Sequence, residues 1–251
     1  MGTRVSLFVT CLVDQLFPKI GLAMAGVLER VGYECEFREA QTCCGQPALN
    51  SGFPSEARQV AGHFLDTFRG AEYIVVPSGS CASMIRHHFS VLFEKDAETA
   101  ARAAAVSSRV YEFSEFLLKV AQVEDVGARF DGSVTYHDSC HALREMNIRQ
   151  QPRSLLRHVR GLELREMALA EECCGFGGTF AVKFGELSSN MLDGKIQSIA
   201  RTGAEAVVSI DPSCLMQIEG GLRRRGLPIR ALHLAEVLAQ GLEDVAFCGI
   251  F

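Results

Sequence analysis

Cys43-Cys44-Gly45 occurs a second time in this chain, as Cys173-Cys174-Gly175. In each half a further cysteine precedes the pair by 32 or 33 residues, and another follows it by 37 or 40 residues. Eight of the ten cysteines therefore form two matched sets of four, which indicates an internal duplication. The two sets are Cys11, Cys43, Cys44 and Cys81 in the first half, and Cys140, Cys173, Cys174 and Cys214 in the second half.

The residues before the last cysteine of each set are duplicated as well. Tyr73-Ile-Val-Val-Pro-Ser-Gly-Ser-Cys81 matches Ala206-Val-Val-Ser-Ile-Asp-Pro-Ser-Cys214 in its apolar run and in its Ser-Cys ending. A chain of 251 residues is long enough for two repeats that each bury a core. The duplication predicts a first cysteine-rich repeat over residues 1–125 and a second over residues 126–251.

Short apolar runs precede the outer cysteines of both sets. These runs cover residues 5–10, 73–76, 134–136 and 206–210, and they are typical of buried strands. Segments with apolar residues at helical spacing predict helices over residues 20–30, 54–70, 94–108, 113–120, 155–159, 187–200 and 232–242. The alternation predicts an α/β fold of two tandem repeats, each a small parallel sheet flanked by helices. The cysteines are expected on loops at the C-terminal ends of strands, where ligands of such sheets bind.

Composition limits the classes of partner and the compartment. The net charge is −5, and the basic residues form no stripe that would follow a nucleic-acid backbone, so no nucleic-acid partner is expected. No apolar run reaches the roughly 18 residues of a membrane-spanning helix, and the first residues do not resemble a signal peptide. We therefore expect a cytoplasmic protein without a transmembrane segment, in which cysteines stay reduced.

Three chemical roles are open to the two cysteine sets. Disulfides fit poorly because the compartment is reducing and because adjacent cysteines rarely bridge without strain. Structural zinc usually takes cysteines spaced two to four residues apart, and that spacing is missing here. Iron–sulfur binding fits better, because a cluster spreads its thiolate ligands over several irons and adjacent thiolates reach different ones. The glycine after each pair would let the backbone approach the cluster.

The cysteine pattern resembles a known group of proteins. The duplicated Cys-Cys-Gly is similar to the cysteine-rich domain found in the B-type subunits of heterodisulfide reductase and in glycolate oxidase iron–sulfur subunits. Five stretches also look like the lactate utilization protein A family, and the resemblance runs over nearly the whole chain. It implies a protein that works with lactate utilization proteins B and C in the oxidation of L-lactate to pyruvate. The stretches are Val5-Ser-Leu-Phe-Val-Thr-Cys-Leu-Val-Asp14, Cys43-Cys-Gly-Gln-Pro-Ala48, Pro77-Ser-Gly-Ser-Cys81, Cys173-Cys-Gly-Phe-Gly-Gly-Thr-Phe180 and His233-Leu-Ala-Glu-Val-Leu238.

The chain departs from one feature of the wider group. Heterodisulfide-reductase-type repeats often end in CxxC and so supply five cysteines, whereas Met84 and Gln217 stand at the corresponding last positions here. Four cysteines per half suit an ordinary [4Fe–4S] cluster, with one or two clusters per chain and the eight matched cysteines as ligands. The missing fifth cysteines argue against direct disulfide reduction.

Electron relay is the function that the sequence favours. Lactate oxidation releases two electrons and two protons, which a flavin or nicotinamide usually takes as a hydride. No GxGxxG follows a predicted strand, so the chain shows no dinucleotide fingerprint. We expect the chain to take electrons from a centre held elsewhere in its complex. A metal-binding assembly scaffold, or a heterodisulfide-reductase-like protein acting on a thiol or a quinone, stays open as an alternative.

Histidines near the second cysteine set have two interpretations. His137 and His141 stand on either side of Cys140, where they could donate hydrogen bonds to cluster sulfur or move protons. Both could equally be ordinary loop residues. His233 is expected to be a structural residue at the start of a helix.

Four further residues have simple structural explanations. Asp138 and Asp211 shortly precede cysteines, where turn formation accounts for them without a catalytic role. Cys35 lies in a strand-like run and is expected to be a small buried residue. Cys248, near the end of the chain, is expected to be a free thiol.

Overall fold

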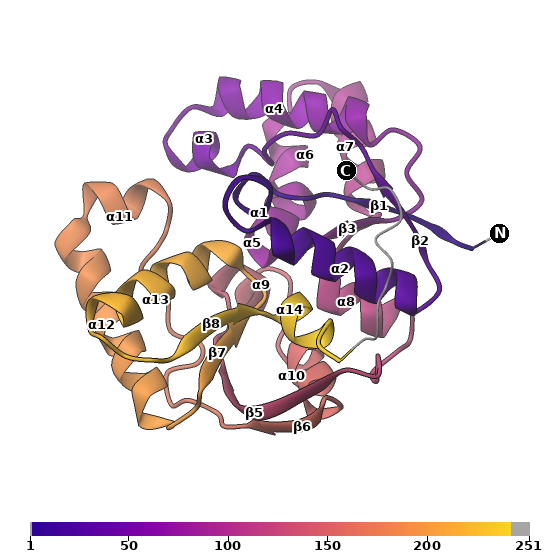
Figure 1. Ribbon diagram of the computed structural model, residues 1–251. Coiled ribbons are helices and arrows are strands. Elements are labelled where there is room, and N and C mark those ends of the chain that lie inside the picture. The colour runs from indigo at the N-terminus through magenta and orange to yellow at the C-terminus, as the bar shows by residue number, and fades with distance from the viewer. Residues whose placement is uncertain (1, 242–251) are drawn as a thin grey trace.

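The chain folds into two α/β halves, each built on a parallel sheet (Figure 1). The computed structural model describes residues 2–241, so Cys248 lies outside the described part of the chain. The strand orders are β2-β1-β3-β4 and β6-β5-β7-β8, and the paired strands are parallel, which confirms the predicted architecture. The strands are β1 (Arg4–Leu7), β2 (Glu34–Phe37), β3 (Ile74–Val76), β4 (Val110–Glu112), β5 (Arg129–Tyr136), β6 (Arg160–Leu164), β7 (Ala206–Ser209) and β8 (Arg230–His233).

Helices of the first half lie on both faces of its sheet. They are α1 (Cys11–Leu16), α2 (Pro18–Arg30), α3 (Gln46–Asn50), α4 (Pro54–Thr67), α5 (Gly79–Ser83), the π-helix η1 (Met84–His88), α6 (Phe89–Leu92), α7 (Ala97–Ser107) and α8 (Phe113–Lys119). Helices α4, α6 and α7 pack together on one side, while α2 and α8 lie on the other (Figure 1). This arrangement follows from the right-handed crossovers that connect parallel strands.

The second half repeats this plan with fewer helices. They are α9 (Cys140–Arg144), α10 (Gln150–Arg157), α11 (Thr179–Lys183), α12 (Gly185–Arg201), α13 (Pro212–Arg224) and α14 (Leu234–Leu238). Helices α12 and α13 pack together on one face of the sheet, and α10 and α14, which contact α8 and α2 of the first half, lie on the other (Figure 1). Across residues 2–241, every helix is too short or too polar to cross a lipid bilayer.

Each sheet places its two central strands at a topological switch point. From β1 the chain passes first to β2 on one side, and β3 then pairs with β1 on the other side. Strand β5 has the same relation to β6 and β7. The carboxyl ends of such neighbouring strands diverge to leave a crevice, and the cysteines that follow β1, β3, β5 and β7 are placed there.

The last helix of each half packs on a helix of the other half. Helix α14 packs on α2 of the first half, and α8 packs on α10 of the second half. One hydrophobic core consequently contains residues from both halves, among them Phe113 and Phe116 of the first and Leu155 and Val237 of the second. We retain the proposal that one repeat passes into the other near residue 125, in the connection between α8 and β5.

Several edge strands differ from the sequence prediction. Strands β4 and β6 were not expected, and the helix expected over residues 232–242 is wrong at its start, because Arg230–His233 forms β8 and the helix covers only Leu234–Leu238. Position 242 lies outside the described residues. Edge strands carry exposed or half-exposed side chains, as β6 and β8 do, so they lack the continuous apolar run that identifies a central strand. The helix expected over residues 155–159 occurs earlier, as α10.

Close packing at Gly79 joins the halves and leads to a first prediction. A Cβ atom at Gly79 would lie 2.5 Å from the Cβ of Ala142 in α9. We expect Gly79→Ala to force α5 and α9 apart and to lower the free energy of unfolding by about 1–3 kcal/mol, the usual cost of overpacking. Urea denaturation measures this loss as a lower midpoint.

Gly62 supplies the matched control within helix α4. A Cβ atom there would meet nothing within 4 Å, so Gly62→Ala should leave stability unchanged or raise it by up to about 1 kcal/mol through helix propensity. A Gly79→Ala protein that unfolds at the same urea concentration as the unsubstituted protein would contradict the close contact between α5 and α9.

Candidate metal centre

Four cysteines from separate segments meet at the end of the first sheet. Cys11 is the first residue of α1, directly beyond β1, and Cys81 lies in the first turn of α5, beyond β3. Cys43 and Cys44 arrive on the loop between β2 and α3. The Cys11 thiol lies 3.7 Å from the Cys43 Sγ, and the Cys44 thiol lies 3.4 Å from the Cys81 Sγ. The structure thus brings together the whole first set.

The second set is assembled in the same way. Cys140 begins α9 beyond β5, and Cys214 lies in the first turn of α13 beyond β7. Cys173 and Cys174 lie on the loop before α11. The Cys140 and Cys173 thiols influence each other's ionisation, and the Cys174 and Cys214 Sγ atoms lie within 4.8 Å of each other. In both halves the paired cysteines lie on loops as predicted, but the outer cysteines lie in first helical turns because each helix begins only a few residues after its strand.

Both sets face a single cavity of about 410 Å³. Helix α11 lies at one side of this cavity, through Thr179 and Val182. Its lining includes the members of both sets, namely Cys11, Cys43, Cys44, Cys81, Cys140, Cys173, Cys174 and Cys214. Two sites that are far apart in the sequence therefore share one space.

The glycine after each cysteine pair has the same conformation in both halves. Gly45 has φ +86° and Gly175 has φ +84°, values that favour glycine. A Cβ atom would also lie 3.3 Å from the Ala57 carbonyl oxygen in α4, or 2.5 Å from the Ser188 carbonyl oxygen in α12. The structure thus gives a reason that the sequence did not: each glycine lets the loop turn closely against α4 in the first half or α12 in the second.

This turn aims a backbone N–H group at sulfur. The Gly45 N–H donates to the Cys43 Sγ at 3.4 Å, and the Gly175 N–H donates to the Cys173 Sγ at 3.3 Å. Such hydrogen bonds stabilise a thiolate and would lower the electron density on a metal-bound sulfur. The same sulfur–amide contact therefore occurs once in each set.

The thiols within each set oppose one another's ionisation. Hydrogen bonds from Cys11 and Cys44, followed by the Gly45 N–H, lower the pKa of Cys43 to about 3. The hydrogen bond to Cys43, burial and nearby thiols raise the pKa of Cys11 far above its usual value. Cys173 and Cys140 show the same opposed pKa shifts in the second half. Without a cation, the first set stabilises a thiolate at Cys43 and the second at Cys173, while the pKa values of Cys11, Cys44, Cys140 and Cys174 are raised.

This donor set fits a metal centre. Four thiols in contact become fully ionised only if a positive centre offsets their mutual repulsion, and metal binding releases those protons. The nine cysteines among the described residues are free, so no disulfide competes for these sulfurs there. All-sulfur coordination is the chemistry of iron–sulfur clusters and of structural zinc.

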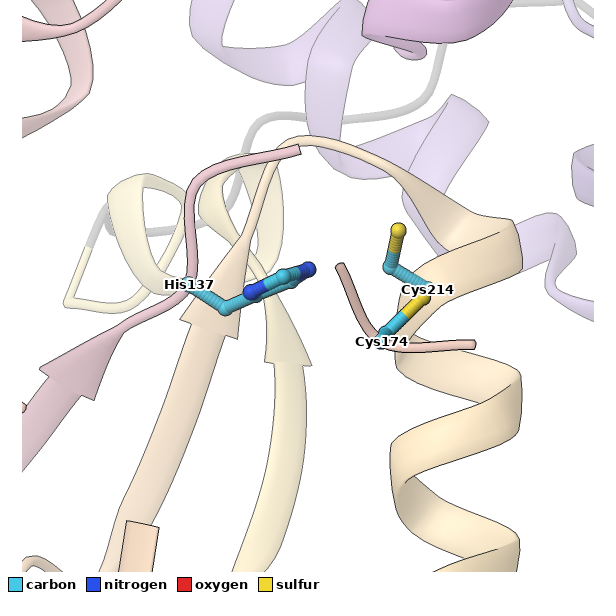
Figure 2. Close-up of side chains that lie close together, drawn as sticks. All are labelled: His137, Cys174 and Cys214. Atoms are coloured by element: carbon cyan, nitrogen blue, oxygen red, sulfur yellow. The ribbon is translucent and has the colours of Figure 1, made fainter. Parts of the chain in front are cut away.

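His137 is the nearest nitrogen donor to the second set. Figure 2 shows its ring directed toward Cys174 and Cys214, and its ring nitrogen and their two Sγ atoms all lie within 4.8 Å of one another. It is fully buried, and neither ring nitrogen has a hydrogen-bond partner among the described residues. Burial lowers the pKa of His137 to about 3, so the ring is neutral. His141 lies at the cavity, with Nδ1 3.6 Å from the Cys140 Sγ.

Asp138 and Asp211 do more than form turns. Asp138 makes a buried, bidentate ion pair with Arg153, at 2.7 and 2.8 Å. Asp211 caps α13 by accepting from the Ser213 N–H, as a turn residue would. It also accepts from the Ser80 N–H of the first half at 2.8 Å, so one carboxylate links the surroundings of the two cysteine sets.

His233 and Cys35 have the structural roles expected of them. The His233 side chain caps α14 by accepting from the Ala235 N–H, within a capping box completed by Glu236. The Cys35 thiol is half-buried beside the Ala25 carbonyl oxygen, outside the lining of the shared cavity. Neither residue belongs to the candidate centre.

Lys195 is the site-adjacent residue that the sequence analysis missed. Only 1% of its surface is exposed, and its ammonium group donates to the carbonyl oxygens of Leu169 and Ala170. A signal was present in the sequence, because Lys195 lies at helical spacing between the buried residues Leu192 and Ile199 of α12. A charged residue on the buried face of a helix needs a partner, and here two backbone carbonyl oxygens accept from it while Cys174 and Cys214 lie within range of its charge.

Comparison with known proteins gives the family. A model of the family described as "Cysteine-rich domain" matches residues 5–86 and again residues 134–219. "Lactate utilization protein A" from Anoxybacillus flavithermus is 50% identical over 235 residues, which cover 94% of this chain and 98% of the relative. The protein of the same name from a Geobacillus species is 47% identical over the same share of each chain. This chain belongs to the lactate utilization protein A family.

A solved structure supports the fold independently. A hypothetical protein from Helicobacter pylori superposes with a TM-score of 0.67 over 96% of this chain, at 11% sequence identity. This chain spans half the length of that protein. At such low identity the likeness shows the shared fold alone.

The two positions that lack a fifth cysteine lie apart from the cavity lining. Met84 is fully buried at the start of η1, in the hydrophobic core. The Gln217 side-chain amide donates to the Ser188 Oγ at 3.1 Å. Each half of this family member therefore presents four thiols to the cavity.

The opposed thiol pKa values generate a second prediction. In metal-free protein at pH 5.5, brief treatment with iodoacetamide should modify Cys43 and Cys173 first, because only thiolates react. Cys35 is the internal control, since burial raises its pKa to about 12 and keeps it protonated. Peptide mass spectrometry would measure the order of labelling, and labelling of Cys35 before Cys43 would contradict the assigned contacts.

Proposed function

We propose that this chain is an iron–sulfur subunit of a system that oxidises L-lactate to pyruvate, and that it relays electrons. The observation that carries the proposal is the pair of four-thiol sets facing one cavity. The names of the relatives supply the pathway, since they are lactate utilization proteins. Lactate utilization B and C type proteins are the partners that we propose.

We assign the oxidation of lactate itself to a partner protein. Conversion of lactate to pyruvate releases two electrons and two protons, and the first acceptor is usually a flavin or a nicotinamide. This chain offers no dinucleotide fingerprint, and its cavity is lined mainly by thiols and apolar groups. We therefore assign the hydride acceptor to another protein of the system and electron transfer onward to this chain.

The eight matched cysteines would hold one [4Fe–4S] cluster per set. A bound [4Fe–4S] cluster supplies one-electron redox chemistry without moving a proton or an atom. The Gly45 and Gly175 N–H groups would each donate to a ligand sulfur. His137 would donate a ring N–H toward the second set, and His141 would lie at the edge of the cavity. The shared cavity keeps the two sets close, as a relay requires.

Zinc is the second candidate, and a specific distance favours it. Tetrahedral zinc with bonds of about 2.3 Å holds its sulfurs roughly 3.8 Å apart, close to the 3.7 Å between Cys11 and Cys43. In that case the chain would be an assembly scaffold for its partners. Metal analysis separates the two candidates directly.

Iron loading provides the third prediction. Protein purified without oxygen should contain about eight irons and eight sulfides per chain, as two [4Fe–4S] clusters require. Cys43→Ala/Cys44→Ala should halve both values by removing the first set, and Cys173→Ala/Cys174→Ala should do the same for the second. Zinc in place of iron, in protein kept strictly anaerobic, would overturn the relay and favour the scaffold.

Assembly with the partners separates relay from scaffold in a second way. Each double variant would be mixed with lactate utilization B and C type proteins, and lactate-dependent dye reduction and complex formation would both be measured. A relay predicts that turnover is lost while the complex persists. Loss of the complex itself would favour a scaffold, and lactate oxidation by this chain alone would contradict the assignment of that step to a partner.

A further inference from the structure

The two cysteine sets match, but two pairs of equivalent positions near them carry different residues. Phe8 and His137 are equivalent, because each lies three residues before the first cysteine of its set. Each also makes the same backbone hydrogen bond to the neighbouring central strand. The Phe8 N–H donates to the Val75 carbonyl oxygen at 2.9 Å, and the His137 N–H donates to the Val208 carbonyl oxygen at 2.8 Å.

A second pair of equivalent positions lies on helices α4 and α12. Gly45 approaches Ala57 in α4 closely, and Gly175 approaches Ser188 in α12 in the same way. Ala57 and Ser188 are therefore taken as equivalent, and this aligns α4 with α12. Phe64 lies seven residues beyond Ala57, and Lys195 lies seven residues beyond Ser188. Phe64 and Lys195 are therefore equivalent.

In the first half these two positions form an apolar contact. The rings of Phe8 and Phe64 meet edge to face, with centroids 4.9 Å apart, and both side chains are buried. The main influences on the pKa values of Cys11, Cys43 and Cys44 are the thiols of their own set, burial and adjacent backbone N–H groups. The first half thus has two packed, uncharged rings at these positions.

In the second half the same positions hold a histidine and a lysine. Both are almost completely buried, and after burial itself the charge of Lys195 is the next cause that lowers the pKa of His137. Burial lowers the pKa of Lys195 to about 8, and Cys174 and Cys214 are the first groups that oppose this shift. The Lys195 ammonium group donates to the Leu169 and Ala170 carbonyl oxygens, shortly before the Cys173-Cys174 loop, so a buried cation lies within electrostatic range of Cys174 and Cys214.

We propose that Lys195, supported by His137, makes the second cysteine set the site of higher reduction potential, where an electron that enters this chain settles. This inference rests on the proposed function. Each one-electron reduction adds negative charge to a cluster and its ligands, and a buried ammonium group stabilises that charge strongly in a medium of low dielectric constant. The uncharged rings of Phe8 and Phe64 offer no such stabilisation. Electrons delivered by the partner's hydride acceptor should settle on the second set.

Proteins that hold a single set test the proposal without altering Lys195. Cys43→Ala/Cys44→Ala retains the second set, and Cys173→Ala/Cys174→Ala retains the first. Anaerobic redox titration followed by EPR would measure the midpoint potential of each. We expect the protein that retains the second set to be reduced at the higher potential. Equal potentials or the reverse order would overturn the inference and leave the proposed function standing.

Lys195→Met identifies the residue responsible, since methionine keeps the chain length without the charge. In full-length, fully loaded protein we expect only the higher-potential signal to move. The shift should reach at least tenfold in the ratio of oxidised to reduced cluster, or about 59 mV for one electron. Phe64→Leu at the equivalent position is the matched control and should leave both potentials unchanged. Normal iron content with unshifted potentials would overturn the role of Lys195, whereas protein without iron and sulfide would overturn this inference together with the proposed function.

Discussion

Mutual repulsion among four converging thiolates is the constraint on which the rest of this structure depends. Each set holds its sulfurs in contact, so in the absence of a cation one thiolate survives only because neighbouring thiols and a backbone N–H donate to it. A positive centre changes this balance, because it can hold every member of the set ionised. The fold meets this constraint twice with the same devices: a cysteine beyond each central strand and a glycine turn that aims one N–H group at sulfur.

Duplication preserved the two sets of four cysteines and changed their surroundings. The two glycine turns and the two strand hydrogen bonds are the same in kind, whereas Phe8 and Phe64 give way to His137 and Lys195. Two copies with identical surroundings would hold an electron equally well and give transfer no direction. In the proposed relay, divergence at these two positions gives the two cysteine sets different affinities for an electron.

The shared cavity depends on close contact between the halves. Gly79 leaves room for Ala142, the Asp211 carboxylate accepts from the Ser80 N–H of the other half, and the final helices α8 and α14 pack across the boundary. Because these contacts lie directly beside the cysteines, packing and site geometry are coupled. A substitution that loosens the joint should disturb both sets together.

The sequence by itself determined the duplication, the two sets of four cysteines and the central strands, because spacing and continuous apolar runs are local properties of the chain. It did not reveal the edge strands β4, β6 and β8, which are short or carry half-exposed side chains and whose partners lie far away in the sequence. Only the tertiary structure decided that both sets face one cavity, that His137 points at Cys174 and Cys214, and that Lys195 lies buried against the Leu169 and Ala170 carbonyl oxygens. These relations join residues through packing between separate elements, and a linear pattern carries no information about which buried faces meet.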